Sequence, residues 1–293
     1  MTPVQYSILI GALVGFSLLE FALGRAQKFR ATAADNLLDL FCFAVLAALT
    51  QPLILWITSK IGYTVAPEYK NAWADLPWYA MVGLLIIGDD MMQYWWHRLS
   101  HSPMLWPLHR AHHSAQYMSA RIVYRNNIFY YLAMPSIWIS GVLVYLGLGS
   151  VFLVFVVVKQ CIVIGAHSDV RWDEPLYRIK ALRPLMWLVQ RTISTPATHF
   201  AHHAMSNADG IGHYTGNFSN MLFLWDLLFG SAHITQQYPK DIGLVDDRLF
   251  GAEKWWVELL YPVFRSRRVH SALVPGGKPY DDPSTAAPAH ANA

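Results

Sequence analysis

The chain of 293 residues is poor in charged residues and in cysteine. Asp, Glu, Lys and Arg make up only 14% of it, whereas soluble domains usually carry about 25%. The two cysteines, Cys42 and Cys161, lie in apolar stretches and form no C-x-x-C pair, which excludes a disulfide framework and a thiolate metal site. A net charge of +3 without a dense basic run argues against nucleic-acid binding. The composition therefore favours neither a disordered chain nor an ordinary soluble enzyme.

Hydrophobic residues account for 54% of the chain and gather in long runs. Five segments approach or reach the roughly 20 residues that span a bilayer as a helix. These predicted segments are 4–23, 37–58, 76–96, 129–149 and 150–166. The only charged residues within them are Glu20, Asp39, Asp89, Asp90 and Lys159. The first segment lacks the basic start of a signal peptide, so we expect a membrane helix there.

The order of the segments predicts an all-α, multi-pass integral membrane bundle. The short turn 147–150 predicts that the fourth and fifth segments form a hairpin. Arg25, Lys28 and Arg30 follow the first segment and place that loop on the cytoplasmic side. The alternation then puts every histidine cluster on the same face, as a cytoplasmic, histidine-rich helical cap. We expect the inner membrane of a bacterium, or the endoplasmic reticulum of a eukaryote.

Three parts of the chain differ in composition. Residues 1–75 contain the first two membrane segments, 76–235 contain the histidine clusters, and 236–293 form a C-terminal segment. Within the second part, 172–192 mixes apolar and basic residues and predicts one helix lying at the membrane interface. The end, 275–293, is rich in Pro, Ala, Asp and Gly and predicts a disordered tail.

The 13 histidines are mostly clustered. The clusters are His97-x-x-x-His101, His109-x-x-His112-His113 and His199-x-x-His202-His203. On a helix, residues three and four apart share a face, so the imidazoles of each cluster can converge. Thr195-Pro196 predicts a helix start just before the third cluster, and Trp106-Pro107 stands similarly before the second. Imidazole suits iron, zinc and copper, and eight ligands exceed what one ion can use, so we predict two metal ions.

Histidines outside the clusters differ in whether we expect them to bind a metal. His167 ends the fifth segment at the same face and is a further predicted ligand, whereas the role of His213 stays open. His233, His270 and His290 are isolated, and we leave them out of the site.

Two charged groups lie on the membrane segments near the clusters. Asp90 lies two helical turns before His97 and could accept the free ring N–H of a ligating histidine, or could instead cap the helix end or extend to the interface. Lys159 could pair with an acidic residue inside the bundle or extend outward.

The order of these motifs resembles the membrane fatty acid hydroxylase/sterol desaturase superfamily. The stretch from Asp90 through Tyr94-Trp95 to His97-Arg98 is similar to its D-x3-Y-W-x-H-R motif. Further similar motifs are Leu105-Trp106 before His109, His112-His113-Ser114, Ile164-Gly165-Ala166-His167-Ser168, Thr195-Pro196 before His199, and Trp225-Asp226-Leu227-Leu228-Phe229-Gly230. The resemblance covers about residues 80 to 231. Asn217-Phe218-Ser219 stands where the family usually has Asn-Tyr-Gly, a departure that we expect to concern the substrate pocket.

The resemblance implies a non-haem di-iron enzyme that uses O₂ and two electrons to hydroxylate or desaturate a lipid C–H bond. The implied ligands are the eight clustered histidines and His167, with zinc as a substitute metal and no separate catalytic side chain. Asp90 and Asp226 would orient ligands from behind. We find no fused cytochrome b5 domain and no dinucleotide fingerprint, so an external cytochrome b5 or ferredoxin would donate electrons.

The sequence leaves the substrate open among fatty acyl chains, sterols, carotenoids and lipid head groups. A non-catalytic zinc-binding or transport protein is the main alternative. A membrane zinc hydrolase is weaker, because no H-E-x-x-H motif occurs and no general-base Glu stands beside the clusters.

Overall fold

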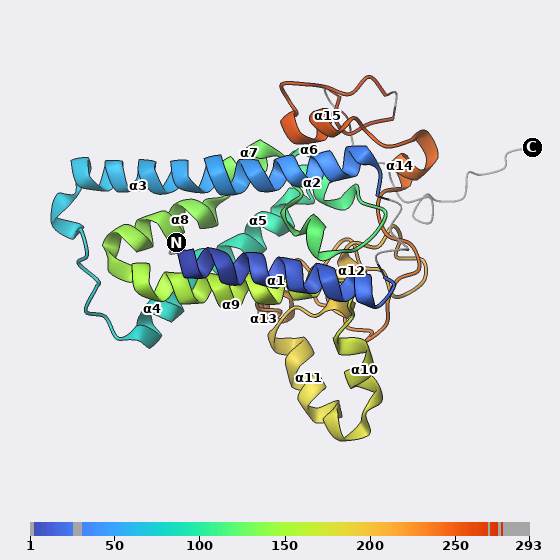
Figure 1. Ribbon diagram of the computed structural model, residues 1–293, viewed down its shortest axis with the longest axis horizontal. Coiled ribbons are helices and arrows are strands. Elements are labelled where there is room, and N and C mark those ends of the chain that lie inside the picture. Colours follow the sequence, from blue (N-terminus) through green and yellow to red (C-terminus); the bar gives the residue numbers. More distant parts are fainter. Residues whose placement is uncertain (1–2, 26–30, 269, 275–276, 278–293) are drawn as a thin grey trace, which may run out of the picture.

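The computed structural model describes residues 3–25, 31–268, 270–274 and 277 (Figure 1). Helices alone form the named elements of this part of the chain, with a single isolated bridge between Ala204 and Ile242. The all-α prediction is therefore confirmed for the described residues. The predicted tail lies outside them, apart from residue 277.

Two apolar stretches have the length and composition of membrane-spanning helices. The first, Ala33–Val65, is continuous through α2 (Ala33–Val45), the π-helical turn η2 (Leu46–Thr50) and α3 (Gln51–Val65). It starts at a capping box in which Thr32 and Asp35 exchange hydrogen bonds. The second is Pro135–His167. A shorter apolar stretch, Ile10–Ala22, belongs to α1 (Pro3–Ala22).

The second stretch contains the predicted hairpin. It consists of α8 (Pro135–Leu143), η6 (Val144–Leu148) and α9 (Gly149–His167), and the chain reverses at Gly147, whose φ of 118° suits glycine. The fourth predicted segment begins too early, because α7 (Ile128–Ala133) ends before Pro135. Proline cannot continue a preceding helix and restricts the residue before it.

The third predicted segment is helical from Trp78 to Ser100. It is built from α4 (Trp78–Leu85), the π-turn η4 (Ile86–Met91) and α5 (Met92–Ser100). The η4 turn buries both Asp89 and Asp90, although neighbours on a regular α-helix point in different directions. This helix leads directly to the first histidine cluster.

Figure 1 shows the long helices α1, α3 and α9 running along the longest axis of the molecule. At one end of them lie α6 (Trp106–His113), the 3₁₀ turn η5 (Ala120–Tyr124) and α12 (Pro196–His202), which starts at a Thr195 cap with Pro196 first, as predicted. Beyond α12 follow α13 (Leu224–Leu228), α14 (Val245–Phe250) and α15 (Trp255–Leu260). A 3₁₀ turn, η3 (Pro67–Tyr69), follows α3.

The prediction of one helix over 172–192 is wrong. The segment forms α10 (Asp173–Arg178), a 3₁₀ turn η7 (Lys180–Leu182) and α11 (Arg183–Thr192), which project together from the body (Figure 1). Ile179 has an extended backbone and Pro184 stands in the first turn of α11, so the helix restarts there.

Candidate metal centre

The nine histidines predicted as ligands meet in two groups. The five-histidine group contains His97, His101, His109, His113 and His202, and the four-histidine group contains His112, His167, His199 and His203. Within each group the ligand nitrogens lie within 4.8 Å of one another. His213 is not in either group and packs its ring on His233 at 5.0 Å. His270 packs its ring against Phe250 at 4.7 Å, and His290 lies outside the described residues.

Adjacent histidines serve different groups. His113 belongs to the five-histidine group and His112 to the other, although both lie on α6. In the same way, His202 on α12 and His203 just after it are divided between the groups. The groups are neighbours, since the rings of His113 and His203 stack at 4.5 Å. Each short helix therefore helps to build both sites.

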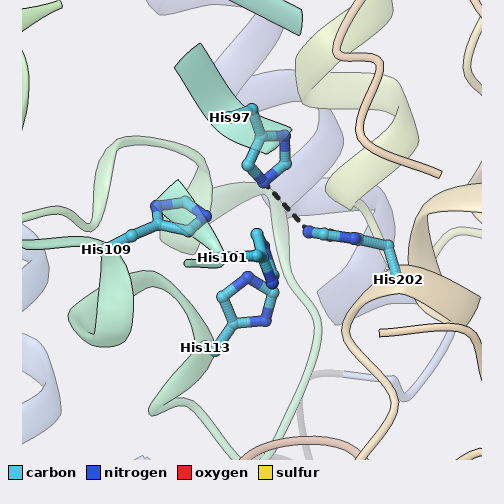
Figure 2. A group of neighbouring side chains, drawn as sticks. All are labelled: His97, His101, His109, His113 and His202. Atoms are coloured by element: carbon cyan, nitrogen blue, oxygen red, sulfur yellow. Dashed lines mark hydrogen bonds between the residues drawn. The ribbon is translucent and has the colours of Figure 1, made fainter. Parts of the chain in front are cut away.

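The tautomers in the five-histidine group follow from their backbone partners. The Nδ1–H of His97 donates to the Phe218 carbonyl at 2.6 Å, and that of His202 donates to the Gly216 carbonyl at 2.7 Å. A carbonyl oxygen can only accept, so each neutral ring keeps a lone pair on Nε2. These two Nε2 atoms face each other at 3.0 Å (Figure 2). Two lone pairs that face each other at this distance repel, and a cation bound by both nitrogens would relieve that repulsion.

The four-histidine group repeats this arrangement. His112 donates from Nδ1 to the Arg125 carbonyl at 3.2 Å, and His167 donates to the Val163 carbonyl at 2.8 Å. Their Nε2 atoms lie 3.4 Å apart, and the Nε2 of His199 lies 2.9 Å from that of His167. The lone pairs of His112 and His167 again face each other.

The donor set fits metal ions in both groups. Two imidazole nitrogens bound to one ion at about 2.1 Å lie roughly 3.0–3.4 Å apart, depending on the coordination angle. The Nε2 atoms of His101, His109 and His113 are buried and have no hydrogen-bond partner among the described residues. Burial also lowers the pKa of His109, His113 and His202 well below 6.5, which keeps the rings neutral and able to bind a metal. An all-imidazole set suits iron, zinc or copper.

Asp226 supports the five-histidine group through one peptide unit. Its carboxylate accepts the N–H groups of Phe218 and Ser219, both at 2.8 Å, and the hydroxyl of Ser231 at 2.6 Å. These bonds fix the loop whose Phe218 carbonyl holds His97. Asp226 thus orients a histidine indirectly, without touching it.

Asp90 does not have the partner that the sequence suggested. It accepts hydrogen bonds from Trp225 Nε1 at 2.9 Å and from the Leu222 N–H at 3.2 Å, whereas the ring N–H of His97 goes to Phe218. Asp90 is 2% exposed, so it does not extend to the interface either. Residues 218–225 therefore contact both side chains, because Leu222 and Trp225 bond Asp90 and Phe218 bonds His97.

Several supporting residues were missed from the sequence. Asn126 accepts the Nδ1–H of His109 at 2.9 Å. Glu20, buried in α1, accepts the hydroxyl of Ser168 at 2.7 Å and the N–H groups of Asp169 at 3.0 Å and Ala120 at 2.9 Å. It thereby fixes the residues that follow His167. The charge of Glu20 within an apolar segment was the one sequence signal for these residues. The backbone carbonyls that accept from the histidines carry no side-chain pattern and could not have been found in this way.

The departure at Asn217-Phe218-Ser219 lies at the metal centre. The Phe218 ring packs 5.1 Å from the His101 ring, and its carbonyl holds His97. We expected this tripeptide to concern the substrate pocket, but the bond that holds His97 comes from the backbone of Phe218, which tolerates a change of side chain. Asn217, in contrast, uses its side chain and donates to the Thr198 and His233 carbonyls.

A buried ionic network anchors α6. Arg110 donates to Asp246 at 2.8 Å and to Asp247 at 2.5 Å, and it also contacts Glu258 of α15. Arg268 contacts both aspartates from the other side, at 2.7 and 2.8 Å. The C-terminal segment thus holds the helix that carries three of the histidines.

A cavity of about 350 Å³ leads to the histidines, within the size range of ligand pockets. His97, His109 and His112 stand in its wall, so it reaches both groups. Most of the remaining wall is apolar and comes from α3, α8 and α9, with residues such as Leu55, Ile137 and Phe152. An apolar chain could enter it and approach both metal positions.

Comparisons with known proteins agree with this site. Residues 82–231 match the family model described as fatty acid hydroxylase. The chain is 24% identical to the alkylglycerol monooxygenase of Danio rerio over 261 residues, which is 85% of this chain and 52% of the relative. It is 26% identical to the alkylglycerol monooxygenase of Xenopus tropicalis over 159 residues, 54% of this chain and 31% of the relative.

The chain spans about half the length of the first of these relatives and less of the second. No solved structure matches. The family match covers just over half of the chain, from the helix that carries His97 to the residues after Asp226, and includes all nine histidines. The chain belongs to the membrane fatty acid hydroxylase superfamily.

Proposed function

We propose that the chain binds two iron ions, one in each histidine group, and oxidises a C–H bond of a membrane lipid with O₂. The observation that carries the proposal is the pairing of Nε2 lone pairs in both groups, at 3.0 Å between His97 and His202 and at 3.4 Å between His112 and His167. Family membership and the alkylglycerol monooxygenase relatives support oxidation of a lipid.

Different residues of this chain would bind the metal, orient its ligands and bind the lipid. Iron held by the nine histidines would supply the activation of O₂ with two electrons that an unactivated C–H bond requires. The Phe218, Gly216, Arg125 and Val163 carbonyls hold the rings in one tautomer and one orientation. The apolar cavity binds the lipid and excludes bulk water from the site. Hydroxylation and desaturation are both compatible with this arrangement.

We further propose a multi-pass membrane protein with the metal centre on the cytoplasmic face. The outward surfaces of α1 and α3 carry exposed Leu18, Phe21 and Trp56, which suit contact with lipid. Residues 76–235 would form the catalytic unit, and an external cytochrome b5 or ferredoxin would supply electrons. Because the relatives are alkylglycerol monooxygenases, neutral glycerol ether lipids are the first substrates to test.

The test is the metal content and Mössbauer spectrum of protein purified from cells fed ⁵⁷Fe. We expect about two irons per chain with an antiferromagnetically coupled signal, and O₂ uptake with lipid and a reductant. His112→Ala should lose the coupled signal. His233→Ala is the matched control, because His233 lies outside both groups and should leave the spectrum unchanged.

Tight zinc binding without iron under iron feeding, together with no O₂ uptake, would refute the oxidase and favour the zinc-binding alternative. Loss of the coupled signal in both variants would instead show that the signal does not report on these two groups.

A further inference from the structure

The cavity wall contains a polar site away from the histidines. Asp89 in η4 and Lys159 in α9 both line the cavity and contact each other through a buried ion pair. Asp89 lies eight residues before His97, and Lys159 lies eight residues before His167. At 1.5 Å per residue, the two positions are roughly 12 Å along their helices from His97 and His167. The pair is therefore separate from the metal centre.

Ser140 of α8 lies in the same wall and has an unused hydroxyl. It is 4% exposed, and its Oγ has no hydrogen-bond partner among the described residues. Two other buried helix hydroxyls bond back to their own helix, Thr58 to the Ile54 carbonyl at 2.9 Å and Ser100 to the Trp96 carbonyl at 2.6 Å. A buried hydroxyl without a partner destabilises the fold, because it has lost its hydrogen bonds to water. A ligand in the cavity would remove this cost.

Asp89 and Ser140 adjoin a close contact between η4 and α8. A Cβ added at Gly88 would come within 2.8 Å of Ile139 Cγ2, so η4 and α8 pack closely at the residues next to Asp89 and Ser140. Glycine at position 88 allows this approach. Asp89 and Ser140 are the next residues along these two helices, and both line the cavity.

The charges around Lys159 disfavour an anionic ligand. The Lys159 ammonium already contacts Asp89 and lies 3.8 Å from Asp90 Oδ1, so it faces two carboxylates. A carboxylate on the ligand would be a third negative charge in a buried site, which is costly. A hydroxyl can instead donate to Asp89 and accept from Ser140.

We infer that the cavity selects an uncharged, hydroxyl-bearing lipid, and that Asp89 and Ser140 bind its hydroxyl about two helical turns from the metal ligands. The inference rests on the proposed function only in taking this cavity as the lipid site. It adds a specificity site that the histidine motifs do not contain. Plain hydrocarbon chains and fatty acids are then poor ligands.

Equilibrium binding to protein in lipid nanodiscs tests the inference without turnover. Radiolabelled hexadecan-1-ol is displaced by hexadecane or hexadecanoate at pH 8, with empty nanodiscs as the blank. We expect unlabelled hexadecan-1-ol to compete at least tenfold better than either. Equal competition by hexadecane, or stronger competition by hexadecanoate, would overturn the inference.

Two serine variants locate the site. Ser140→Ala should reduce the preference for the alcohol over hexadecane by about tenfold, equivalent to 1.4 kcal/mol. Ser136→Ala is the matched control, because it makes the same change one turn away on α8 in the same cavity wall. An unchanged preference in Ser140→Ala, or an equal loss in both, would contradict the assignment.

Binding and catalysis can fail separately. If the alcohol binds selectively but the iron-loaded protein takes up no O₂, the proposed function fails and this binding site stands. If O₂ uptake occurs with no preference among the three ligands, the oxidase stands and this inference fails.

Discussion

The two histidine groups are built from shared helices but differ in their number of histidines and in the residues that hold them in place. The five-histidine group draws on α5, α6 and α12 and is held by the 216–218 loop, which Asp226 fixes. The four-histidine group includes His167 at the end of the α8–α9 hairpin, where Glu20 of α1 holds the following residues. One site thus depends on a loop after α12, and the other depends on the long apolar helices.

This difference shows how the fold ties both sites together. Because α6 and α12 each contribute to both groups, neither site can move as a unit away from the other. The groups differ in number of donors, however. Loss of one imidazole leaves four nitrogens in one group and three in the other.

The largest expected effect comes from the adjacent pair His202 and His203. His202→Ala and His203→Ala should each lower lipid oxidation more than 100-fold, since a missing ligand alters the metal itself. We expect His203→Ala to lose more of its metal, because its group has only four donors. Iron content of the two purified variants, measured side by side, checks the difference.

Equal iron loss in both variants would show that the fifth histidine does not help its group to retain the metal. His213→Ala is a suitable control for general damage near α12, because His213 lies outside both groups. It should retain the iron content of the unchanged protein.

Acid should destabilise the metal-free protein. Burial lowers the pKa of His109, His113, His199 and His202 well below 6.5, so these rings stay neutral in the folded chain. The unfolded chain binds protons near pH 6.5, so the folded state binds fewer and its stability falls as the pH drops through that value. Each ring contributes up to about 1.4 kcal/mol per pH unit.

Unfolding by denaturant at pH 8, 7 and 6, followed by tryptophan fluorescence, measures this slope. Bound metal should raise stability at pH 8 and be released as protons compete for Nε2. His109→Phe should give a shallower slope by about one proton. A metal-free protein equally stable at pH 8 and 6 would contradict the buried neutral histidines.

The buried Arg110 of α6 should contribute more to the free energy of unfolding than the exposed Arg178 of α10. Arg110→Met leaves Asp246, Asp247 and Glu258 without one of their guanidinium partners, and breaking a buried pair costs about 3–5 kcal/mol. Arg178→Met removes a pair with Glu174 on the projecting α10, where the arginine side chain is 76% exposed. Exposed pairs of this kind contribute about 0.3–0.5 kcal/mol.

Unfolding free energies of the two variants, measured in the same detergent, check this contrast. Since Arg110 lies on α6 between ligands of both groups, its loss should also reduce iron in both. A change below 1 kcal/mol in Arg110→Met would show that the network does not anchor the helix.

The helices and the convergence of the histidines could be predicted because they depend on local patterns. Long apolar runs indicated α1, α3 and α9, the spacing of the clusters indicated convergent imidazoles, and Thr195-Pro196 indicated the start of α12. Each of these rests on residues within a few turns of one another.

The rest depends on tertiary contacts. Spacing could not divide His112 from His113, because that depends on which helices lie on either side of α6. The partner of Asp90 comes from residues 222–225, more than 130 positions away. The carbonyl acceptors of His97 and His202 are backbone atoms, which no residue pattern marks.

Two carboxylate variants separate the supports of the two groups. Asp226→Asn replaces a carboxylate oxygen that accepts a peptide N–H near His97, and Glu20→Gln does the same after His167. Since neither carboxylate touches a histidine, each variant should keep its ligands and weaken metal binding by about 10- to 100-fold. Asp226→Asn should affect the five-histidine group and Glu20→Gln the four-histidine group. Mössbauer spectra at limiting ⁵⁷Fe would show two different sites losing intensity. If both variants lose the same site, the two groups do not have independent supports, and the shared helices α6 and α12 alone determine both.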